Sequence, residues 1–208
     1  MHATLSGMAG SSARPASDPS APNDPAVEAA FESTPGTLTA EILDGELHAL
    51  PRPRPRHART ATRLVGRLGP FDDDPGEPGG WVLLAEPELH LGPKPDKVVP
   101  DIAGWRRARL PGSVFDENAP GQLTIAPDWI CEVLSDRTER LDRGKKMRIY
   151  RREGVKHVWL ISPTLETLEV YRLDAGQWTL HETFEGNAVV RAEPFDALEL
   201  PLASLWAR

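Results

Sequence analysis

The chain has 208 residues, a formal net charge of −7 and a single cysteine. This length is enough for one well-cored domain, and the acidic balance argues against a protein coated in basic residues. One cysteine, Cys131, excludes an intramolecular disulfide framework and any four-cysteine zinc site. No apolar run approaches the roughly 20 residues of a membrane span, and no secretory signal pattern opens the chain. We therefore expect a cytoplasmic protein without membrane attachment.

The first part of the chain, residues 1–25, consists mostly of Ala, Ser, Pro and Gly. Such a composition has little to bury, so it predicts a disordered tail and leaves residues 26–208 as a single folded domain. A short helix is expected at Val27–Glu32. After it, the stretch LTAEILDGELHAL has two apolar-rich arms joined by Asp44-Gly45, a dipeptide typical of a tight type I′ hairpin.

An extended connector is predicted for PRPRPR, residues 51–56, because proline lacks an N–H and fixes φ. The next segment, His57–Leu68, has the periodicity of an amphipathic helix, with apolar residues on one face and arginines on another. The arginines of that second face are Arg56, Arg59, Arg63 and Arg67. They form either an ordinary solvated face or a ridge that contacts phosphates.

The rest of the chain alternates strand and helix signals. The stretch FDDDPGEPGG is predicted to be a loop whose aspartates are solvated rather than a metal cluster. Strands are expected at Trp81–Leu91, Lys97–Trp105 and Trp129–Leu134, and a helix interrupted by Gly144 at Thr138–Glu153. KHVWLIS reads as a buried strand, and TLEVYRL and QWTLHETF as an antiparallel pair. This order predicts a mixed α/β sheet.

Two acidic residues stand in apolar strand contexts. Asp101 lies within VVPDIAGW, and Glu132 lies within DWICEVLS. Side chains alternate along a strand, so Glu132 shares a face with Ile130 and Leu134. If the two strands are neighbours, the two carboxylates converge and repel each other unless a cation lies between them. We therefore predict a divalent metal site that holds Mg²⁺, or Mn²⁺ in its place, since Mg²⁺ suits carboxylates, waters and a substrate phosphate.

A basic segment follows directly on Glu132. Residues 137–156 contain nine Lys and Arg against three acids, a local net charge of +6. A cation-binding acid pair beside positive charge that attracts polyanions is what phosphodiester hydrolysis requires. Asp142, Lys146 and Tyr150 fall on one side of the predicted helix. The alternative interpretation is a buried structural salt bridge between Glu132 and Lys146.

These residues resemble the Uma-two family of restriction-endonuclease-like proteins, within the PD-(D/E)xK nuclease superfamily. The resemblance covers most of residues 38–205 and includes AEILDGELHAL and Arg56-His57. Its most specific parts are Pro100-Asp101, Glu132-Val133-Leu134-Ser135 and Asp142-x₃-Lys146-x₃-Tyr150-x₃-Gly154-Val155. It implies an α/β (α+β) fold in which a restriction-endonuclease-like mixed central sheet is flanked by helices and preceded by an N-terminal hairpin.

The resemblance also implies the roles of the central residues. Asp101 and Glu132 would be metal ligands and, with Lys146, catalytic residues. The superfamily motif has a lysine two positions after the second acid on the same strand, but that position is Leu134 here. Lys146, on the following helix, is the residue that matches the lysine in this family.

Further residues match the family pattern with less definite roles. Glu41 and Glu46 match an acidic hairpin, and one of them would supply a further acid to the site unless both are ordinary hairpin charges. Three residues are candidates for supporting the site, each with a packing, capping or surface-pairing role as the alternative. These are Tyr150, Asp142 and His57.

The resulting hypothesis is a Mg²⁺-dependent endonuclease that hydrolyses phosphodiester bonds in DNA. The expected contacts to DNA phosphates are Arg56, Arg59, Arg63, Lys145 and Arg148. Nucleases that cut both strands often act as dimers, so a homodimer is an open expectation. Two other classes also stay open. One is a catalytically weak or inactive nuclease-fold module that binds nucleic acid, and the other is a protein-interaction scaffold in which the acids are structural.

Overall fold

The computed structural model describes residues 23–72 and 78–206. Residues 1–22 of the predicted tail and residues 73–77 of the predicted Asp-rich loop lie outside these described residues. The first helix, α1 (Pro25–Glu32), confirms the predicted short helix and begins two residues earlier. The side chain of Asp24 accepts a hydrogen bond from the Ala26 amide at 2.8 Å and caps the helix. In the described part of the chain, no helix has the length and apolar character needed to cross a membrane.

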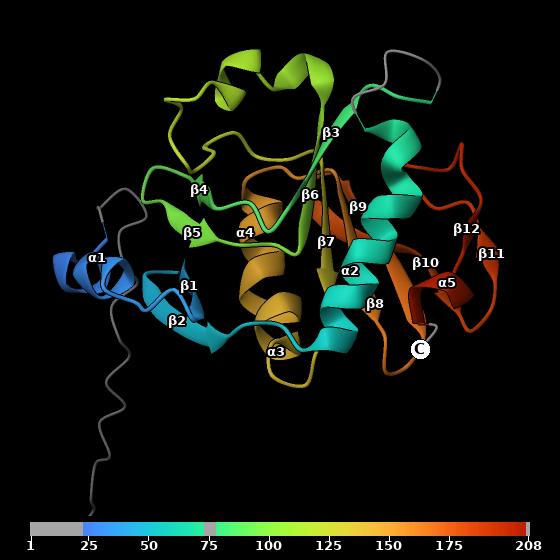
Figure 1. The fold of residues 1–208 in the computed structure, drawn as a ribbon, viewed down its shortest axis with the longest axis horizontal. Helices are drawn as coiled ribbons and strands as arrows, with labels where there is room; N and C mark the ends of the chain where they lie inside the picture. Colours follow the sequence, from blue (N-terminus) through green and yellow to red (C-terminus); the bar gives the residue numbers. More distant parts are fainter. Residues whose placement is uncertain (1–22, 73–77, 207–208) are drawn as a thin grey trace, which may run out of the picture.

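A six-stranded mixed sheet lies at the centre of the molecule (Figure 1). The strand order is β10-β9-β8-β7-β6-β3, and β7 pairs with β8 in parallel while the other neighbours are antiparallel. The strands are β3 (Trp81–Ala85), β6 (Ile102–Arg106), β7 (Trp129–Val133), β8 (His157–Ser162), β9 (Thr167–Asp174) and β10 (Gln177–Glu185). This mixed sheet, flanked by helices, confirms the predicted fold class.

A second, four-stranded sheet has the order β2-β1-β5-β4. Its strands are β1 (Leu38–Leu43), β2 (Glu46–Pro51), β4 (Leu89–Leu91) and β5 (Asp96–Val98). The predicted hairpin is confirmed, because β1 and β2 pair antiparallel around Asp44 and Gly45. Both turn residues have positive φ, 54° and 76°, as a type I′ turn requires.

Two strands predicted as continuous are each divided between the two sheets. The predicted strand Trp81–Leu91 forms β3 in the large sheet and β4 in the small one, with Glu86 at a positive φ of 48° between them. The predicted strand Lys97–Trp105 likewise forms β5 and then β6. Asp101 therefore lies immediately before β6, at the point where the chain passes from one sheet to the other.

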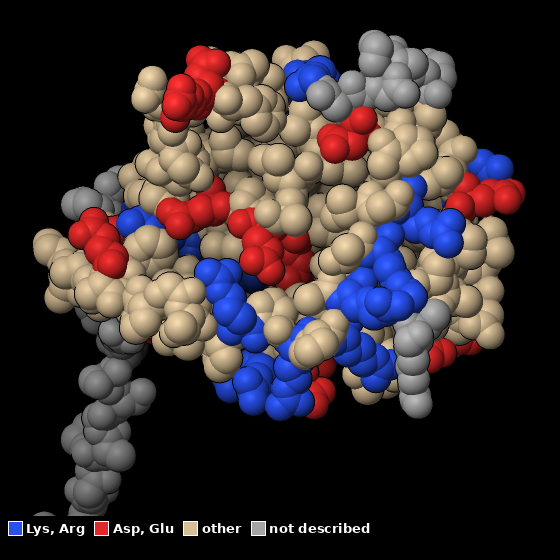
Figure 2. Space-filling model, in the orientation of Figure 1, with Lys and Arg blue, Asp and Glu red and all other residues tan. Residues whose placement is uncertain are grey.

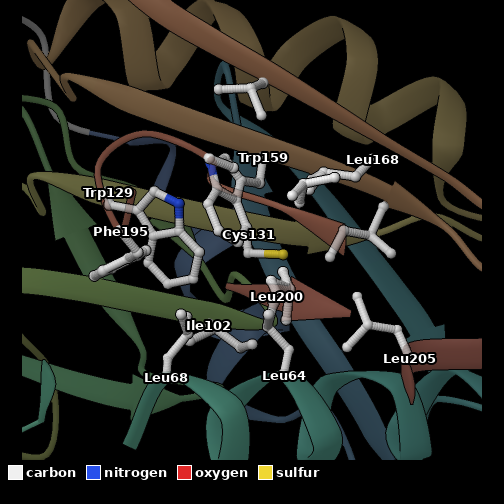
Figure 3. Packing of buried hydrophobic residues seen from close by; sticks show 14 of the residues in the cluster. Leu64, Leu68, Ile102, Trp129, Cys131, Trp159, Leu168, Phe195, Leu200 and Leu205 are labelled. Atoms are coloured by element: carbon white, nitrogen blue, oxygen red, sulfur yellow. The ribbon is translucent and has the colours of Figure 1, made fainter. Parts of the chain in front are cut away.

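One face of the large sheet packs against α2 (Pro55–Leu68), which confirms the predicted amphipathic helix. Figure 3 shows Leu64 and Leu68 pointing from α2 toward the sheet, where Ile102 and Cys131 lie. The C-terminal segment is docked against the same side, as its apolar residues predict. It comprises β11 (Val189–Val190), β12 (Leu200–Pro201) and α5 (Ala203–Trp206).

The opposite face packs against the segment that follows β7, where α4 (Met147–Arg152) buries Ile149 and Tyr150. Side chains alternate along β7 as predicted. Trp129, Cys131 and Val133 belong to the α2 side, whereas Ile130 belongs to the α4 side. Glu132 thus points to the same side as α4. Short 3₁₀ helices are also present in the connecting segments, at Gly69–Phe71, Arg107–Arg109 and Gly112–Phe115.

The helix predicted at Thr138–Glu153 is present but is not a regular α-helix. It consists of α3 (Glu139–Leu141), a π-helical turn η4 (Asp142–Lys146) and α4. A π turn contains one extra residue, so apolar positions before and after it do not follow a single 3.6-residue period. This accounts for the absence of one apolar stripe in the sequence. It also places Asp142 and Lys146, both buried, on the side that faces the sheet.

Candidate active site

The two acids predicted to converge lie side by side. β6 and β7 are neighbours, and Ile102 is opposite Cys131 in their antiparallel register. The next position along this register brings Asp101 beside Glu132. The backbone amide of Asp101 donates to Glu132 Oε2 at 3.4 Å, and the amide of Val133 donates to Asp101 Oδ2 at 2.7 Å. Each carboxylate is therefore bound to the backbone of the other strand.

Asp101 has a second partner on the neighbouring helix. His57, in the first turn of α2, places Nε2 3.2 Å from Asp101 Oδ2, and both side chains are mostly buried. Burial opposes protonation of His57, but the hydrogen bond and charge of Asp101 outweigh it and raise the pKa of the imidazole. His57 Nδ1 is buried without a hydrogen-bond partner among the described residues. His57 therefore contacts the predicted metal ligand directly.

Glu132 is almost completely buried, with 1% of its surface exposed. The phenol of Tyr150 donates to Glu132 Oε1, and Lys146 Nζ lies 3.1 Å from the same oxygen. Burial, reinforced by the charges of Asp142 and Asp101, raises the pKa of Glu132 well above its usual range, against the opposing effects of Lys146 and Tyr150. The buried acid thus has a counter-charge, but other acids surround it as well.

Lys146 lies at the centre of a group of carboxylates. Its Nζ is 3.1 Å from Glu41 Oε1 and 3.5 Å from Asp142 Oδ1, in addition to its contact with Glu132, and it donates to the Val99 carbonyl at 3.3 Å. Burial disfavours its charge, but these carboxylates outweigh that effect and raise the pKa of Lys146 well above its usual range. Burial also raises the pKa of Asp142, which faces the same group. The surrounding carboxylates therefore stabilise the charged form of the Lys146 ammonium group.

The two hairpin acids have different positions. Glu41, on β1, is 4% exposed, accepts a hydrogen bond from the Val99 amide at 2.8 Å and contacts Lys146. Glu46, at the start of β2, has a largely exposed side chain that pairs with Lys145 at 2.6 Å. Of the two candidates, the fold brings Glu41 to the site and leaves Glu46 at the hairpin surface.

These side chains lie at the base of a cleft of about 400 Å³. The cleft lies between the β2–α2 connector, the loop after β7 and the turn after β8. Figure 2 shows Asp and Glu atoms in the central hollow of this face, with Lys and Arg atoms on either side of it. The acids that line the cleft near its base are Glu41, Asp101, Glu132 and Asp142. With one lysine among them, the base carries a surplus of carboxylates.

The predicted phosphate contacts are distributed over two places. Arg56 lines the cleft and donates to the Pro163 carbonyl, whereas Arg59 is exposed on α2 and Arg63 donates to the Ser204 carbonyl at 2.8 Å. Lys145 and Arg148 lie beside the hairpin. Their partners there are Glu46 and His48 for Lys145, and Asp44 for Arg148. Of the nine Lys and Arg in residues 137–156, three are therefore paired with hairpin acids, namely Lys145, Lys146 and Arg148.

The donor set can be compared with what Mg²⁺ requires. Mg²⁺ is held by one or two carboxylates together with waters and substrate phosphate, rather than by a complete protein cage. Asp101 and Glu132 supply such a pair at the cleft base, and Asp101 Oδ1 has no partner among the described residues. No group of three or more His, Cys, Asp or Glu side chains in residues 23–72 and 78–206 forms a ready-made metal cage. The residues therefore fit a hydrated Mg²⁺ held by two carboxylates.

The cleft is also lined by three arginines to which the sequence patterns had assigned no role. Arg52 and Arg54 belong to the connector, and Arg137 to the loop between β7 and α3. The sequence contained a signal for the first two, since PRPRPR presents arginines from a stiff backbone. For Arg137 no local signal distinguished it from the other basic residues of its segment.

Comparison with known proteins identifies the family and the fold. Residues 29–203 match the Uma2 (Uma-two) family, described as "putative restriction endonuclease". A crystal structure from Anabaena variabilis ATCC 29413, described as a putative nuclease belonging to DUF820, is similar with a TM-score of 0.65 and 22% sequence identity. The similarity covers 86% of this chain and 96% of that one, and at this identity it shows a shared fold. No match was found among curated proteins. Because the family match spans most of its length, the chain belongs to the Uma2 family, as the sequence motifs predicted.

Proposed function

We propose that the protein is a Mg²⁺-dependent endonuclease that hydrolyses phosphodiester bonds in DNA. The observation that carries this proposal is the meeting of Asp101, Glu132 and Lys146 at the base of one cleft, although they come from different elements. Membership of a family of restriction-endonuclease type supports the same chemistry. The arginines around the cleft would attract the phosphate backbone.

Asp101 and Glu132 are the residues that would hold the metal, with Glu41 adjacent. When bound, Mg²⁺ would neutralise phosphate charge and lower the pKa of an attacking water. The surplus of carboxylates around Lys146 supports this assignment, because a divalent cation would relieve their mutual repulsion. Mn²⁺ accepts similar oxygen ligands and would substitute.

The chain's own residues would orient the reaction. Lys146 presents an ammonium whose position is fixed by Glu41, Glu132 and the Val99 carbonyl. From there it would donate to an attacking water or to the charge that develops on the phosphate oxygens. Tyr150 fixes the orientation of Glu132, and His57 fixes that of Asp101.

A nicking assay on supercoiled plasmid tests this proposal. The wild type is expected to cut with Mg²⁺ or Mn²⁺ and to stop in EDTA, and Asp101→Asn and Glu132→Gln are each expected to lose at least about 100-fold in rate. Glu182→Gln is a matched control, because it also removes one negative charge but lies on the exposed strand β10. Equal rates for the wild type and both cleft variants would refute the assignment.

A second function is favoured by the contacts of Lys146. Its ion pairs already satisfy part of the charge of Glu41 and Glu132, as in a structural salt bridge, and Leu134 occupies the strand position where the superfamily motif has its lysine. A nuclease-fold module that binds nucleic acid without cutting it would have this arrangement. Salt-sensitive DNA binding that needs no metal, with no cleavage of plasmid or single-stranded DNA, would identify this function.

A further inference from the structure

The connector between β2 and α2 places arginines on the rim of the cleft. Pro51, Pro53 and Pro55 alternate with Arg52, Arg54 and Arg56, and all three arginines line the cleft. Arg54 has φ −72° and ψ 156°, the extended geometry that a proline-rich backbone favours. Such a backbone loses little conformational freedom when a ligand binds, so side chains mounted on it are pre-positioned.

The two ends of this connector are anchored. Pro51 ends β2 in the small sheet, and Pro55 begins α2, which packs on the large sheet. The guanidinium of Arg56 also donates to the carbonyl of Pro163, in the turn after β8. The connector is thus tied to both sheets, and the spacing between its arginines and the carboxylates at the base of the cleft is fixed by the fold.

A fourth arginine reaches the cleft from a distant part of the sequence. Arg137 lies in the loop that joins β7, which carries Glu132, to α3. Arg54 and Arg137 are both exposed, and neither side chain has a hydrogen-bond or ion-pair partner among residues 23–72 and 78–206. Their guanidinium groups are therefore available to a ligand without breaking a contact within the described structure.

The other charged side chains at the cleft rim also leave the arginines accessible to a ligand. Two acids, Glu86 and Asp136, line the cleft beside the four arginines. Arg52 pairs with Glu86 at 3.4 Å, but about half of each side chain is exposed, and such a pair contributes little stability. Arg52 also donates to the Gly36 carbonyl at 3.3 Å, and both contacts are exposed, so Arg52 can exchange them for a phosphate. The cations of the rim are arginines, whose planar fork matches phosphate oxygens better than the point charge of lysine does.

We infer that Arg54 and Arg137, assisted by Arg52 and Arg56, form a phosphate clamp that holds the strand to be cut on both sides of the carboxylates. This inference rests on the proposed function for its substrate, a nucleic-acid strand. Its two principal residues, Arg54 and Arg137, are not among the predicted phosphate contacts, whereas Arg56 belongs to both sets. The clamp consists of the cleft-rim arginines, and it does not include Arg59 and Arg63 farther along α2 or Lys145 and Arg148 beside the hairpin.

The salt dependence of DNA binding tests the clamp without requiring cleavage. A fluorescein-labelled 20-base-pair duplex and its isolated strand are titrated with the full-length protein in EDTA, at several NaCl concentrations. The slope of log K against log[NaCl] counts the phosphates neutralised, at about 0.9 per contact for duplex and about 0.7 for a single strand. Arg54→Gln and Arg137→Gln are each expected to reduce the slope by about one such contact, and Arg54→Lys to retain it.

Arg151→Gln is the matched control. It removes one exposed positive charge, and Arg151 lines a separate groove that shares no residue with the cleft. Its slope is expected to equal that of the wild type. The clamp is refuted if Arg54→Gln and Arg137→Gln also keep the wild-type slope, or if neither DNA binds in low salt. Reduced slopes in a protein that cuts no DNA would uphold the clamp while refuting the proposed nuclease activity. DNA cleavage together with unchanged slopes would support the proposed nuclease activity and refute the clamp.

Discussion

At the scale of single residues, Glu132 illustrates how an acid is kept in the interior. A buried carboxylate is tolerated when donors satisfy it, and here the phenol of Tyr150 and the ammonium of Lys146 converge on one oxygen. The backbone amide of Asp101 donates to the other oxygen through a long contact of 3.4 Å. The acid is thus well satisfied on one oxygen and weakly on the other, as the proposed role in holding a metal would require.

Tyr150→Phe isolates the contribution of the phenol. The ring is completely buried, so phenylalanine keeps the packing while it removes a donor to a buried carboxylate. We expect the free energy of unfolding to fall by about 1–3 kcal/mol, since one oxygen of Glu132 loses a partner. Urea unfolding followed by circular dichroism measures the change. A midpoint identical to that of the wild type would show that the phenol does not stabilise Glu132.

At the scale of elements, the lysine reaches the acids from within a π turn. Asp142 and Lys146 lie within η4, and both point into the buried group around Glu132. The extra residue of this turn shifts the positions after it by about 100° relative to the positions before it, compared with a regular α-helix. Lys146 thus lies next to Glu132, although the strand itself carries Leu134 two positions after that acid. Single π turns within helices are frequent at functional sites.

The parts of the fold that depend on local sequence were predictable, whereas the division of strands between the two sheets was not. Asp44-Gly45 marks the hairpin because few dipeptides accept two positive φ values. By contrast, residues 81–91 and 97–105 each look like one strand, since apolar periodicity does not reveal that the chain passes between two sheets. The choice of Glu41 over Glu46 likewise depended on how the small sheet packs against Lys146.

Pairing of η4 with the sheet gives a pH-dependent prediction. Arg143 donates to both oxygens of Glu169 on β9, at 2.9 and 2.5 Å, and this lowers the pKa of Glu169 below the usual 4.5. A lowered carboxyl pKa contributes stability above pH 4.5, and that contribution is lost as pH falls through the folded-state value. Glu169→Gln is therefore expected to cost about 1 kcal/mol at pH 7 and progressively less below pH 4.5.

Urea unfolding of wild type and variant between pH 7 and pH 3.5 measures this effect. Glu139→Gln is a matched control, because Glu139 pairs with the same arginine within the helix but is more exposed. Its cost is expected to be about 0.3 kcal/mol at pH 7. A cost for Glu169→Gln that stays constant over the pH range would contradict an ionic contribution.

At the scale of the whole molecule, the site depends on α2 being held against the large sheet. Leu64 is fully buried between them, and the same helix carries His57 at its first turn. Leu64→Ala is expected to lower the free energy of unfolding by about 2–5 kcal/mol, because it removes buried apolar surface and leaves a cavity. Thermal and urea unfolding measure the loss. Val65→Ala, at a partly buried position on the same helix, should cost less, and equal costs would argue against this packing.

The surplus of negative charge at the cleft base predicts how the whole molecule responds to metal. A ligand that binds only the folded state stabilises it by RT ln(1 + [L]/Kd), about 2.7 kcal/mol at 100 times Kd. Mg²⁺ should therefore raise the unfolding midpoint of the wild type above that in NaCl of equal ionic strength. Asp101→Asn can keep its bond from the Val133 amide, so it should fold without metal yet gain nothing from Mg²⁺. If Mg²⁺ stabilised the wild type and Asp101→Asn equally, the cation would be acting on surface charge. The carboxylates at the cleft base would then be neutralised by Lys146 and by bound protons alone.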